Sequence, residues 1–276
     1  MEECIMANHV KTALTIAGTD PTGGAGIQAD LKTFQEREVF GMSVITSVVA
    51  QNTTGVQQIE HLPISFIEEQ LKSVISDIVP DSIKTGMIAT PEMMEMVAKH
   101  IQLLQVPYVI DPVMVAKSGD SLMDQTSRRV MQEKLIPLAT VVTPNIPEAE
   151  ILTVMDIKHI SDAEVAAKRI VQDFGAQAAV VTGGHFDQEP VDVLYDGEKL
   201  HYYETNWIDT HHTHGTGCTF SAVITAELAK GRAFHEAVQT AKDFITDAIY
   251  YSLQLGKGNG PTNYWGYRLK GLPNQS

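Results

Sequence analysis

The residues best suited to chemistry are Gly215, Thr216, Gly217 and Cys218, which stand directly before an apolar helical pattern at 219–229. Glycines at a helix start let a ligand come close to the backbone, and the free amide groups there carry a partial positive charge. Such amides can bind phosphoryl oxygens or stabilise charge that develops in a transition state. The same residues would also suit a plain glycine turn capped by Thr216, so this motif alone leaves both interpretations open.

Cys218 falls in the first turn of that expected helix. A free thiol has a pKa of about 8.5 and a helix N-terminus favours the thiolate, so Cys218 could act as a base. A small buried cysteine that only packs the core is the alternative. With His211, His212 and His214 it also offers the side chains that bind zinc, but their spacing matches no common zinc site. These histidines are better explained as residues that shape the loop.

A second glycine-rich segment follows an expected strand near the N-terminus. Gly24, Gly26 and Ala29 fit the G-x-G-x-x-A dinucleotide pattern, which is weak by itself. That pattern also needs an acid at the end of the second strand to hold a ribose, and Gln51 stands there instead. A dehydrogenase is therefore disfavoured. Asp20, just before these glycines, could accept hydrogen bonds from a substrate amino or hydroxyl group, or could form an ordinary Asx turn.

Two carboxylates occur where magnesium and phosphate chemistry would need them. Asp111 ends an expected strand, and Asn145 and Glu148 stand three residues apart on one face of an expected helix start. Mg²⁺ is commonly bound through one or two carboxylates together with phosphate and waters. Ordinary helix capping explains Glu148 equally well. Thr182 and Gly183 follow another strand and could pass close to nucleotide phosphates, and the chain has no Walker-type P-loop.

The elements that would position these residues alternate between short β-branched runs and helical patterns. This alternation predicts an α/β fold with a mostly parallel sheet and helices on both faces, and ligands beyond the carboxyl ends of the strands. A hairpin is expected within 192–203, where Asp196-Gly197 supplies the turn. Strands are expected at 12–18, 43–50, 82–85, 108–111, 140–143 and 178–182, and helices at 24–38, 64–78, 91–104, 125–135, 161–174, 218–230 and 234–253.

The bulk composition excludes some classes of function. The chain has 276 residues and a net charge of -14, which disfavours non-specific binding to nucleic acid or to an anionic membrane. It shows neither a spanning stretch nor a secretory signal, and its two cysteines, Cys4 and Cys218, form no disulfide framework. We therefore expect a cytoplasmic protein with one domain at 12–265, a disordered tail at 1–11 and a C-terminal tail at 266–276.

These motifs, taken in their order along the chain, resemble the ribokinase-like superfamily, and within it the hydroxymethylpyrimidine/phosphomethylpyrimidine kinases of thiamine biosynthesis. The resemblance covers nearly the whole chain except its ends. The segments that carry it are ALTIAGTD at 13–20, GGAGIQADLKTF at 23–34, VAQNT at 49–53, KTGM at 84–87, DPVMVAKSG at 111–119, TPNIPE at 143–148 and HTHGTGCT at 212–219.

The resemblance implies a single-domain three-layer sandwich that uses ATP and Mg²⁺ and is commonly a homodimer. The family phosphorylates a pyrimidine alcohol and then phosphorylates the resulting monophosphate again. Cys218 would occupy the position where ribokinase carries an aspartate base. The resemblance assigns pyrimidine contacts to Gly18, Asp20, Gln51, Met87 and Val113, magnesium to Asp111 and Glu148, nucleotide contacts to Asn145, Thr182, Gly183 and Gly217, and the anion hole to Gly215, Thr216, Gly217 and Cys218.

One position departs from the family pattern, because relatives usually carry a lysine where this chain has Thr182. Lys84 and Lys117 are other possible phosphate partners, with a plain surface lysine as the alternative for both. Three rival functions stay open from the sequence. They are a pyridoxal kinase of the same superfamily, a regulatory nucleotide-binding protein without turnover, and a dinucleotide oxidoreductase.

Overall fold

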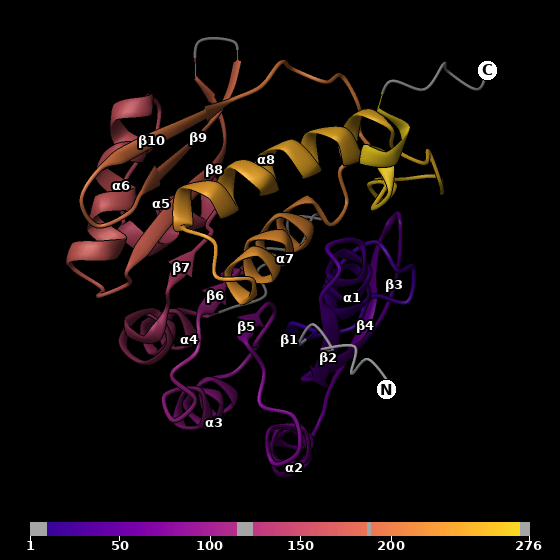
Figure 1. Ribbon diagram of the computed structural model, residues 1–276, viewed down its shortest axis with the longest axis vertical. Coiled ribbons are helices and arrows are strands. Elements are labelled where there is room, and N and C mark those ends of the chain that lie inside the picture. The colour runs from indigo at the N-terminus through magenta and orange to yellow at the C-terminus, as the bar shows by residue number, and fades with distance from the viewer. Residues whose placement is uncertain (1–9, 115–123, 187–188, 271–276) are drawn as a thin grey trace, which may run out of the picture.

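The computed structural model describes residues 10–114, 124–186 and 189–270, which form an α/β sandwich around one eight-stranded sheet (Figure 1). The strand order is β10-β9-β8-β7-β6-β5-β1-β2, with every neighbouring pair parallel from β2 to β8 and antiparallel from β8 to β10. The strands are β1 (Thr12–Ala17), β2 (Phe40–Ile45), β5 (Ser82–Thr85), β6 (Tyr108–Ile110), β7 (Val141–Val142), β8 (Ala178–Phe186), β9 (Glu189–Tyr195) and β10 (Leu200–Glu204). The predicted mostly parallel sheet and the hairpin after β9 are confirmed.

Helices cover both faces of this sheet, as predicted. One face carries α1 (Gly26–Glu36), α7 (Thr216–Ala229) and α8 (Phe234–Tyr250), and α7 packs against both of the others. The other face carries α2 (Ile64–Ile75), α3 (Pro91–Ile101), α4 (Gln125–Val130), α5 (Ile146–Thr153) and α6 (Ile160–Gln172). The two sets lie on opposite sides of the sheet in Figure 1. β1 is buried along its whole length because helices cover it on both sides.

The sequence prediction of a single strand at 43–50 was wrong. β2 ends at Ile45, and the chain then leaves the main sheet to form β3 (Ser47–Asn52), which pairs antiparallel with β4 (Gly55–His61) in a separate two-stranded sheet. We call this hairpin the flap. The switch occurs at Thr46, whose amide donates to the carbonyl of Ala17 at 2.9 Å. Both strands alternate with a period of two, so periodicity could not show that they belong to different sheets.

The helix predicted at 125–135 is shorter than expected. α4 ends at Val130 and continues as a π-helical turn, Met131–Leu135, and a 3-10 turn, Ile136–Leu138, because Pro137 removes a backbone donor. Among the helices of residues 10–114, 124–186 and 189–270, none has the length and apolar character to cross a bilayer.

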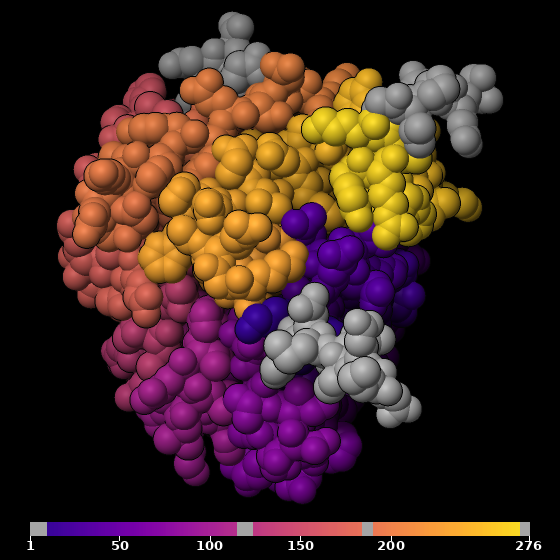
Figure 2. All heavy atoms as spheres, viewed as in Figure 1, coloured from indigo at the N-terminus to yellow at the C-terminus, as the bar shows by residue number. Residues whose placement is uncertain are grey.

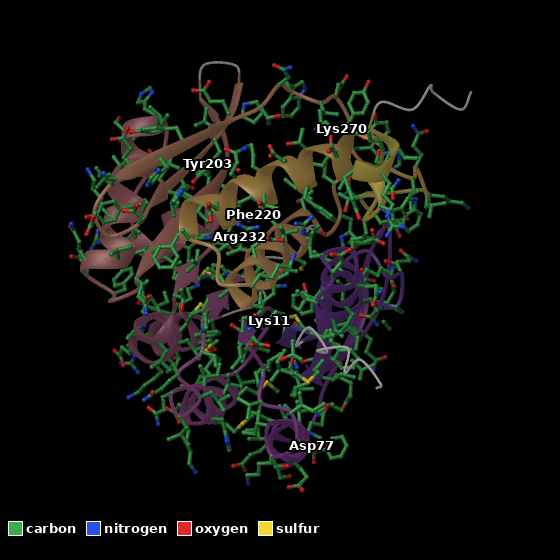
Figure 3. All side chains as sticks on the ribbon, viewed as in Figure 1. Lys11, Asp77, Tyr203, Phe220, Arg232 and Lys270 are labelled. Atoms are coloured by element: carbon green, nitrogen blue, oxygen red, sulfur yellow. The ribbon has the colours of Figure 1, made fainter. Side chains whose placement is uncertain are left out.

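Residues placed by the sequence in the C-terminal tail are partly folded. Gly266–Leu269 form a short 3-10 helix against α8, with the Tyr267 ring centroid 5.4 Å from that of Phe244. Lys270 follows this helix (Figure 3). Its ammonium lies 3.4 Å from the carboxylate of Asp247 on α8. At the other end, Lys11 pairs with Asp81 at 2.7 Å. Contacts with the folded chain thus reach Lys11 at one end and Lys270 at the other.

Candidate active site

The carboxyl ends of the parallel strands surround one cavity of about 260 Å³. It lies beyond the end of β1, which has β2 on one side and the later strand β5 on the other, and such a reversal of strand order is the position where open α/β sheets bind ligands. The flap forms one wall and the start of α7 forms another. The predicted site residues that line this cavity are Gly18, Asp20, Gln51, Met87, Asp111, Val113, Asn145, Glu148, Thr182, Gly215, Thr216, Gly217 and Cys218.

Asp20 organises the loop between β1 and α1. Its carboxylate accepts hydrogen bonds from the backbone amides of Thr22 (2.9 Å) and Ala25 (2.8 Å) and from the Thr22 hydroxyl (2.8 Å). The His214 Nε2 lies 2.7 Å from its second oxygen. Burial alone would raise the pKa of Asp20, but the bonds from His214, Gln51 and Thr22 hold that pKa well below its ordinary value. Asp20 is therefore a carboxylate that joins the first loop to the last one before α7, and it also forms the expected Asx turn.

The turn before α7 has the geometry of an anion site. Gly215 caps the helix with a φ of +82°, and a Cβ atom there would lie 1.7 Å from the carbonyl oxygen of Gly24. Only glycine fits this position. The first helical i→i−4 bond of α7 runs from the Thr219 amide to the Gly215 carbonyl at 2.9 Å. The amides of Gly217 and Cys218 precede that bond, so they have no partner within the helix and lie at the cavity.

Lys84 is neither a surface residue nor a free phosphate ligand. It is completely buried on β5 and forms an ion pair with Asp30 of α1, and its ammonium is 3.8 Å from Asp111 Oδ2. Asp30 also accepts a 2.6 Å hydrogen bond from Thr15. Burial would lower the pKa of Lys84, but the charge of Asp30, together with that of Asp111, raises it to about 12. Lys84 therefore keeps its positive charge and neutralises part of a buried acidic group.

Asp111 and Glu148 form a second buried acidic pair. Burial and the charge of Asp111 raise the pKa of Glu148 to about 8, although the amides of Asn145 and Met114 donate to it. Burial also raises the pKa of Asp111, which accepts a 3.2 Å hydrogen bond from Ser221. Asn145 and Glu148 complete a capping box at the start of α5, with two bonds of 3.0 Å. Capping and a ligand role are thus compatible for Glu148, because the box uses only its Oε2 atom.

The fit of these carboxylates to a metal can be judged from their chemistry. Burial and the charge of Asp111 raise the pKa of Glu148, and burial raises that of Asp111, so both are groups that a divalent cation would stabilise in their charged form. Within the ranges that the structure describes, no group of three or more His, Cys, Asp or Glu side chains could hold a metal ion. Magnesium does not need such a group, because it keeps waters and takes phosphate oxygens. His214, a candidate in the zinc alternative, is instead bonded to Asp20.

The environment of Cys218 corrects the expectation of a thiolate. Burial is the largest influence, and together with the charges of Asp111 and Asp30 it raises the pKa of Cys218 to about 12 despite the nearby Lys84. The thiol donates a hydrogen bond to Asp111, which lowers the pKa of that acid slightly. At neutral pH the side chain therefore carries its proton. A catalytic role for Cys218 stays a prediction, but this environment does not support a role as a free thiolate base.

The expected heterocycle contacts also come together. Gln51 lies on β3 just after a break in register with β4, and its side chain hydrogen-bonds to Asp20. A Cβ atom on Gly18 would lie 2.6 Å from the terminal methyl group of Met87, so glycine there leaves room for the methionine. Met87 and Val113 supply apolar surface from the ends of β5 and β6. A flat ring with polar edges fits such a lining.

One predicted residue does not join the site. Gly183 is not part of the cavity lining, and its amide donates to Asp192 Oδ1 at 2.9 Å. The adjacent Thr182 does line the cavity, and its amide bonds to the Pro144 carbonyl at 2.9 Å. Lys117 and the possible lid at 117–120 lie outside the described residues.

Comparisons with known proteins agree with this geometry. The sequence matches the family model described as phosphomethylpyrimidine kinase over residues 20–263. The chain belongs to the phosphomethylpyrimidine kinase family. It is 51% identical over 263 residues to the hydroxymethylpyrimidine/phosphomethylpyrimidine kinase of Staphylococcus aureus strain MSSA476, covering 94% of this chain and 95% of that protein.

Two solved structures show the same architecture. An ADP complex of Bacillus subtilis pyridoxal kinase aligns with a TM-score of 0.88 at 46% identity, covering 94% of this chain and 99% of that one. Phosphomethylpyrimidine kinase from Clostridium difficile 630 aligns with a TM-score of 0.77 at 40% identity, covering 87% of this chain and 99% of that one. The ribokinase-like fold predicted from the sequence is confirmed.

Some residues of the cavity in this phosphomethylpyrimidine kinase were given no role in the sequence prediction. Asp30 lies on the buried face of α1 beside Ile27 and Phe34, and an acid on a buried helix face needs a partner, which was the available signal. His214 was assigned only to loop shape, yet its ring holds Asp20. Asn259 also lines the cavity, and nothing in its sequence neighbourhood indicated that.

Proposed function

We propose that this protein transfers the γ-phosphoryl group of ATP to the hydroxyl group of 4-amino-5-hydroxymethyl-2-methylpyrimidine. It then phosphorylates the resulting monophosphate to the diphosphate, in thiamine biosynthesis. One observation carries the proposal. Gly217 and Cys218, whose amides precede the first i→i−4 bond of α7, line the same cavity as Gln51, Met87 and Val113. An acceptor ring and a migrating phosphoryl group can therefore be held side by side.

The residues of this chain contribute mainly positioning and charge stabilisation, which phosphoryl transfer requires. The amides of Gly217 and Cys218 donate to the equatorial oxygens of the migrating group, aided by the positive end of the α7 dipole. Losing one such donor costs about 2.7–4 kcal/mol of barrier in other enzymes. The acceptor oxygen forms the new bond to the γ-phosphorus while the bond from that phosphorus to the β-phosphate oxygen breaks, and the hydroxyl proton leaves to the transferred phosphoryl group or to water. Gln51 offers both a donor and an acceptor to an aminopyrimidine edge.

Magnesium is part of this proposal, with Asp111 and Glu148 as the residues that would hold it and its waters. When bound, it neutralises charge on the phosphate groups and so favours their approach to an acidic cavity. Thr182 and Asn145 lie beside each other in a backbone bridge at the cavity, where they would meet the nucleotide phosphates. Gly183, outside the lining, would act only through the shape of this turn.

Pyridoxal phosphorylation is the second candidate, because a pyridoxal kinase aligns with a TM-score of 0.88. A substrate panel distinguishes the two. ADP release is measured with the pyrimidine alcohol, with its monophosphate, and with pyridoxal, each with ATP and Mg²⁺. We expect the highest kcat/KM with the pyrimidine alcohol and clear turnover of the monophosphate. A higher kcat/KM for pyridoxal, or no turnover of the monophosphate, would refute the proposal.

We also propose a cytoplasmic homodimer. The family resemblance suggests the dimer, and the lack of a disulfide framework in the sequence suits a reducing compartment. Light scattering coupled to size-exclusion chromatography measures the mass in solution. A mass of a single 30.2 kDa chain at micromolar concentration would contradict the dimer.

A further inference from the structure

The flap that covers the cavity has few anchors of its own. It is a two-stranded sheet separate from the main one, and an isolated two-stranded hairpin is at best marginally stable in water. Its base is held by Thr19, whose amide donates to Ser47 at 3.0 Å and whose hydroxyl accepts from the Val49 amide at 3.1 Å. The cavity wall supplied by Val49, Gln51, Val56 and Ile59 therefore needs a further anchor toward the tip.

A distant segment supplies that anchor. The Thr53 hydroxyl, at the flap tip, accepts hydrogen bonds from the backbone amides of Lys257 and Gly258, both at 3.2 Å. The packing is close enough to require glycine, because a Cβ atom on Gly256 would lie 2.4 Å from the Thr53 side chain. A Cβ atom on Gly258 would lie 2.1 Å from the Thr53 carbonyl oxygen. We call residues 256–262 the latch. In Figure 2 the yellow C-terminal residues lie against the indigo N-terminal part of the chain.

The other end of the latch holds the loop that leads to the anion site. The His214 amide donates to the Gly260 carbonyl at 3.0 Å, and the Thr262 amide donates to the His214 carbonyl at 3.3 Å. These bonds form a parallel bridge between His214 and Pro261. His214 precedes Gly215, the cap of α7, and its ring contacts Asp20. The latch thus connects the flap tip at one end to the anion site at the other.

We infer that the latch and Thr53 position the flap over the heterocycle and fix the position of the flap relative to the anion site. Thr53 is a positioning residue in this account, acting through the wall that contains Gln51. Asn259, in the middle of the latch, lines the cavity between the two ends. The inference rests on the proposed kinase activity toward a heterocyclic alcohol.

Variants at Thr53 test the hydroxyl itself. Thr53→Val keeps the shape of the side chain but removes the hydroxyl oxygen that accepts the two hydrogen bonds, whereas Thr53→Ser keeps this oxygen. We expect Thr53→Val to raise KM for the pyrimidine alcohol about tenfold, equivalent to about 1.4 kcal/mol, and Thr53→Ser to stay within about twofold of wild type. Thr240→Val is the matched control, because the Thr240 hydroxyl bonds only within α8 to the Glu236 carbonyl. An unchanged KM in Thr53→Val, or an equal rise in Thr53→Ser, overturns the inference.

A variant in the latch tests whether Thr53 and the latch act through the same contact. Gly258→Ala displaces the latch from the opposite side, so it should raise KM like Thr53→Val, and the double variant should be no worse than the poorer single one. Additive effects overturn the inference.

Amide exchange separates this inference from the proposed function, because it needs no turnover. The Lys257 and Gly258 amides should exchange slowly in wild type and in Thr53→Ser, and at least about tenfold faster in Thr53→Val. Equal exchange in all three overturns the latch. If the three proteins show these exchange differences but the wild-type protein turns over no member of the substrate panel, only the proposed function is refuted.

Discussion

The carboxylate of Asp20 allows the sharpest test of the site, through an Asp20→Asn variant. The side chain is 1% exposed and accepts hydrogen bonds from Thr22, Ala25, His214 and Gln51, with one backbone amide on each oxygen. Asparagine has the same shape but places an NH₂ group where one oxygen was, so at least one buried backbone amide loses its acceptor. A hydrogen bond to a charged group contributes about 1.5–3 kcal/mol, and an unsatisfied buried donor costs about 1–3 kcal/mol.

We therefore expect Asp20→Asn to lower the free energy of unfolding by about 3 kcal/mol at pH 7, measured by urea denaturation. The pKa of Asp20 lies below its ordinary value of 3.8, so its contribution is complete above that pH and is lost as the pH falls through the lowered pKa. The difference between wild type and variant should shrink as the pH drops below about 4. KM for the pyrimidine should rise about tenfold, because the carboxylate holds both Gln51 and the loop before α7.

Asp196→Asn is the control, because Asp196 makes the same kind of contacts away from the cavity. Its carboxylate accepts from the amides of Glu198 (2.9 Å) and Lys199 (2.7 Å) and lies 2.7 Å from His201 Nε2. Its side chain is 21% exposed, so the loss of stability should be smaller and KM should not change. The reasoning fails if the free energy of unfolding of Asp20→Asn lies within about 0.5 kcal/mol of the wild-type value, or if Asp196→Asn raises KM as much as Asp20→Asn does.

Three further predictions follow from the buried charges. Glu148→Gln keeps the cap but removes a carboxylate whose pKa is about 8, so without Mg²⁺ the variant should equal wild type in stability at pH 4.5 and exceed it by a few kcal/mol at pH 9. The exposed Glu236, whose carboxylate likewise accepts from a backbone amide at a helix start, is the control, and Glu236→Gln should show no such trend in urea denaturation. Lys84→Met should cost about 3–5 kcal/mol of stability, and adding Asp30→Asn should recover most of it; a loss under about 1 kcal/mol would contradict the buried ion pair. Because burial raises the pKa of Cys218 to about 12, Cys218→Ala should leave the shape of the kcat–pH profile unchanged between pH 6 and 9. If the variant loses one limb of that profile, Cys218 titrates in this range and acts as a thiolate.

The strands of the main sheet were predictable because burial on both faces forces continuous apolar runs. The site residues after these strands were predictable too, because the carboxyl ends of parallel strands meet at one edge. The flap was not, because β3 alternates in the same way as β2, and only the pairing partner tells them apart. Local sequence patterns carry no information about that choice.

Contacts between distant residues were also beyond the sequence. His214 and Asp20 are 194 residues apart, and Lys84 and Asp30 are 54 apart, so both pairs depend on the order of strands in the sheet. The same dependence applies to the protonation state of Cys218. Its position at a helix start was predicted correctly, but the carboxylates that raise its pKa come from β6 and α1.

The lining of the cavity runs from Ala17 to Asn259, so a substrate touches residues contributed by almost the whole polypeptide. A partly unfolded chain could not offer this set of groups, and ligand binding should therefore stabilise the fold as a whole. At a hundredfold excess over Kd such binding adds about 2.7 kcal/mol to the free energy of unfolding. Proteolysis and amide exchange should slow together at both ends of the sequence when substrate is plentiful. The supply of its own substrate would then help to decide how long the enzyme persists in a cell.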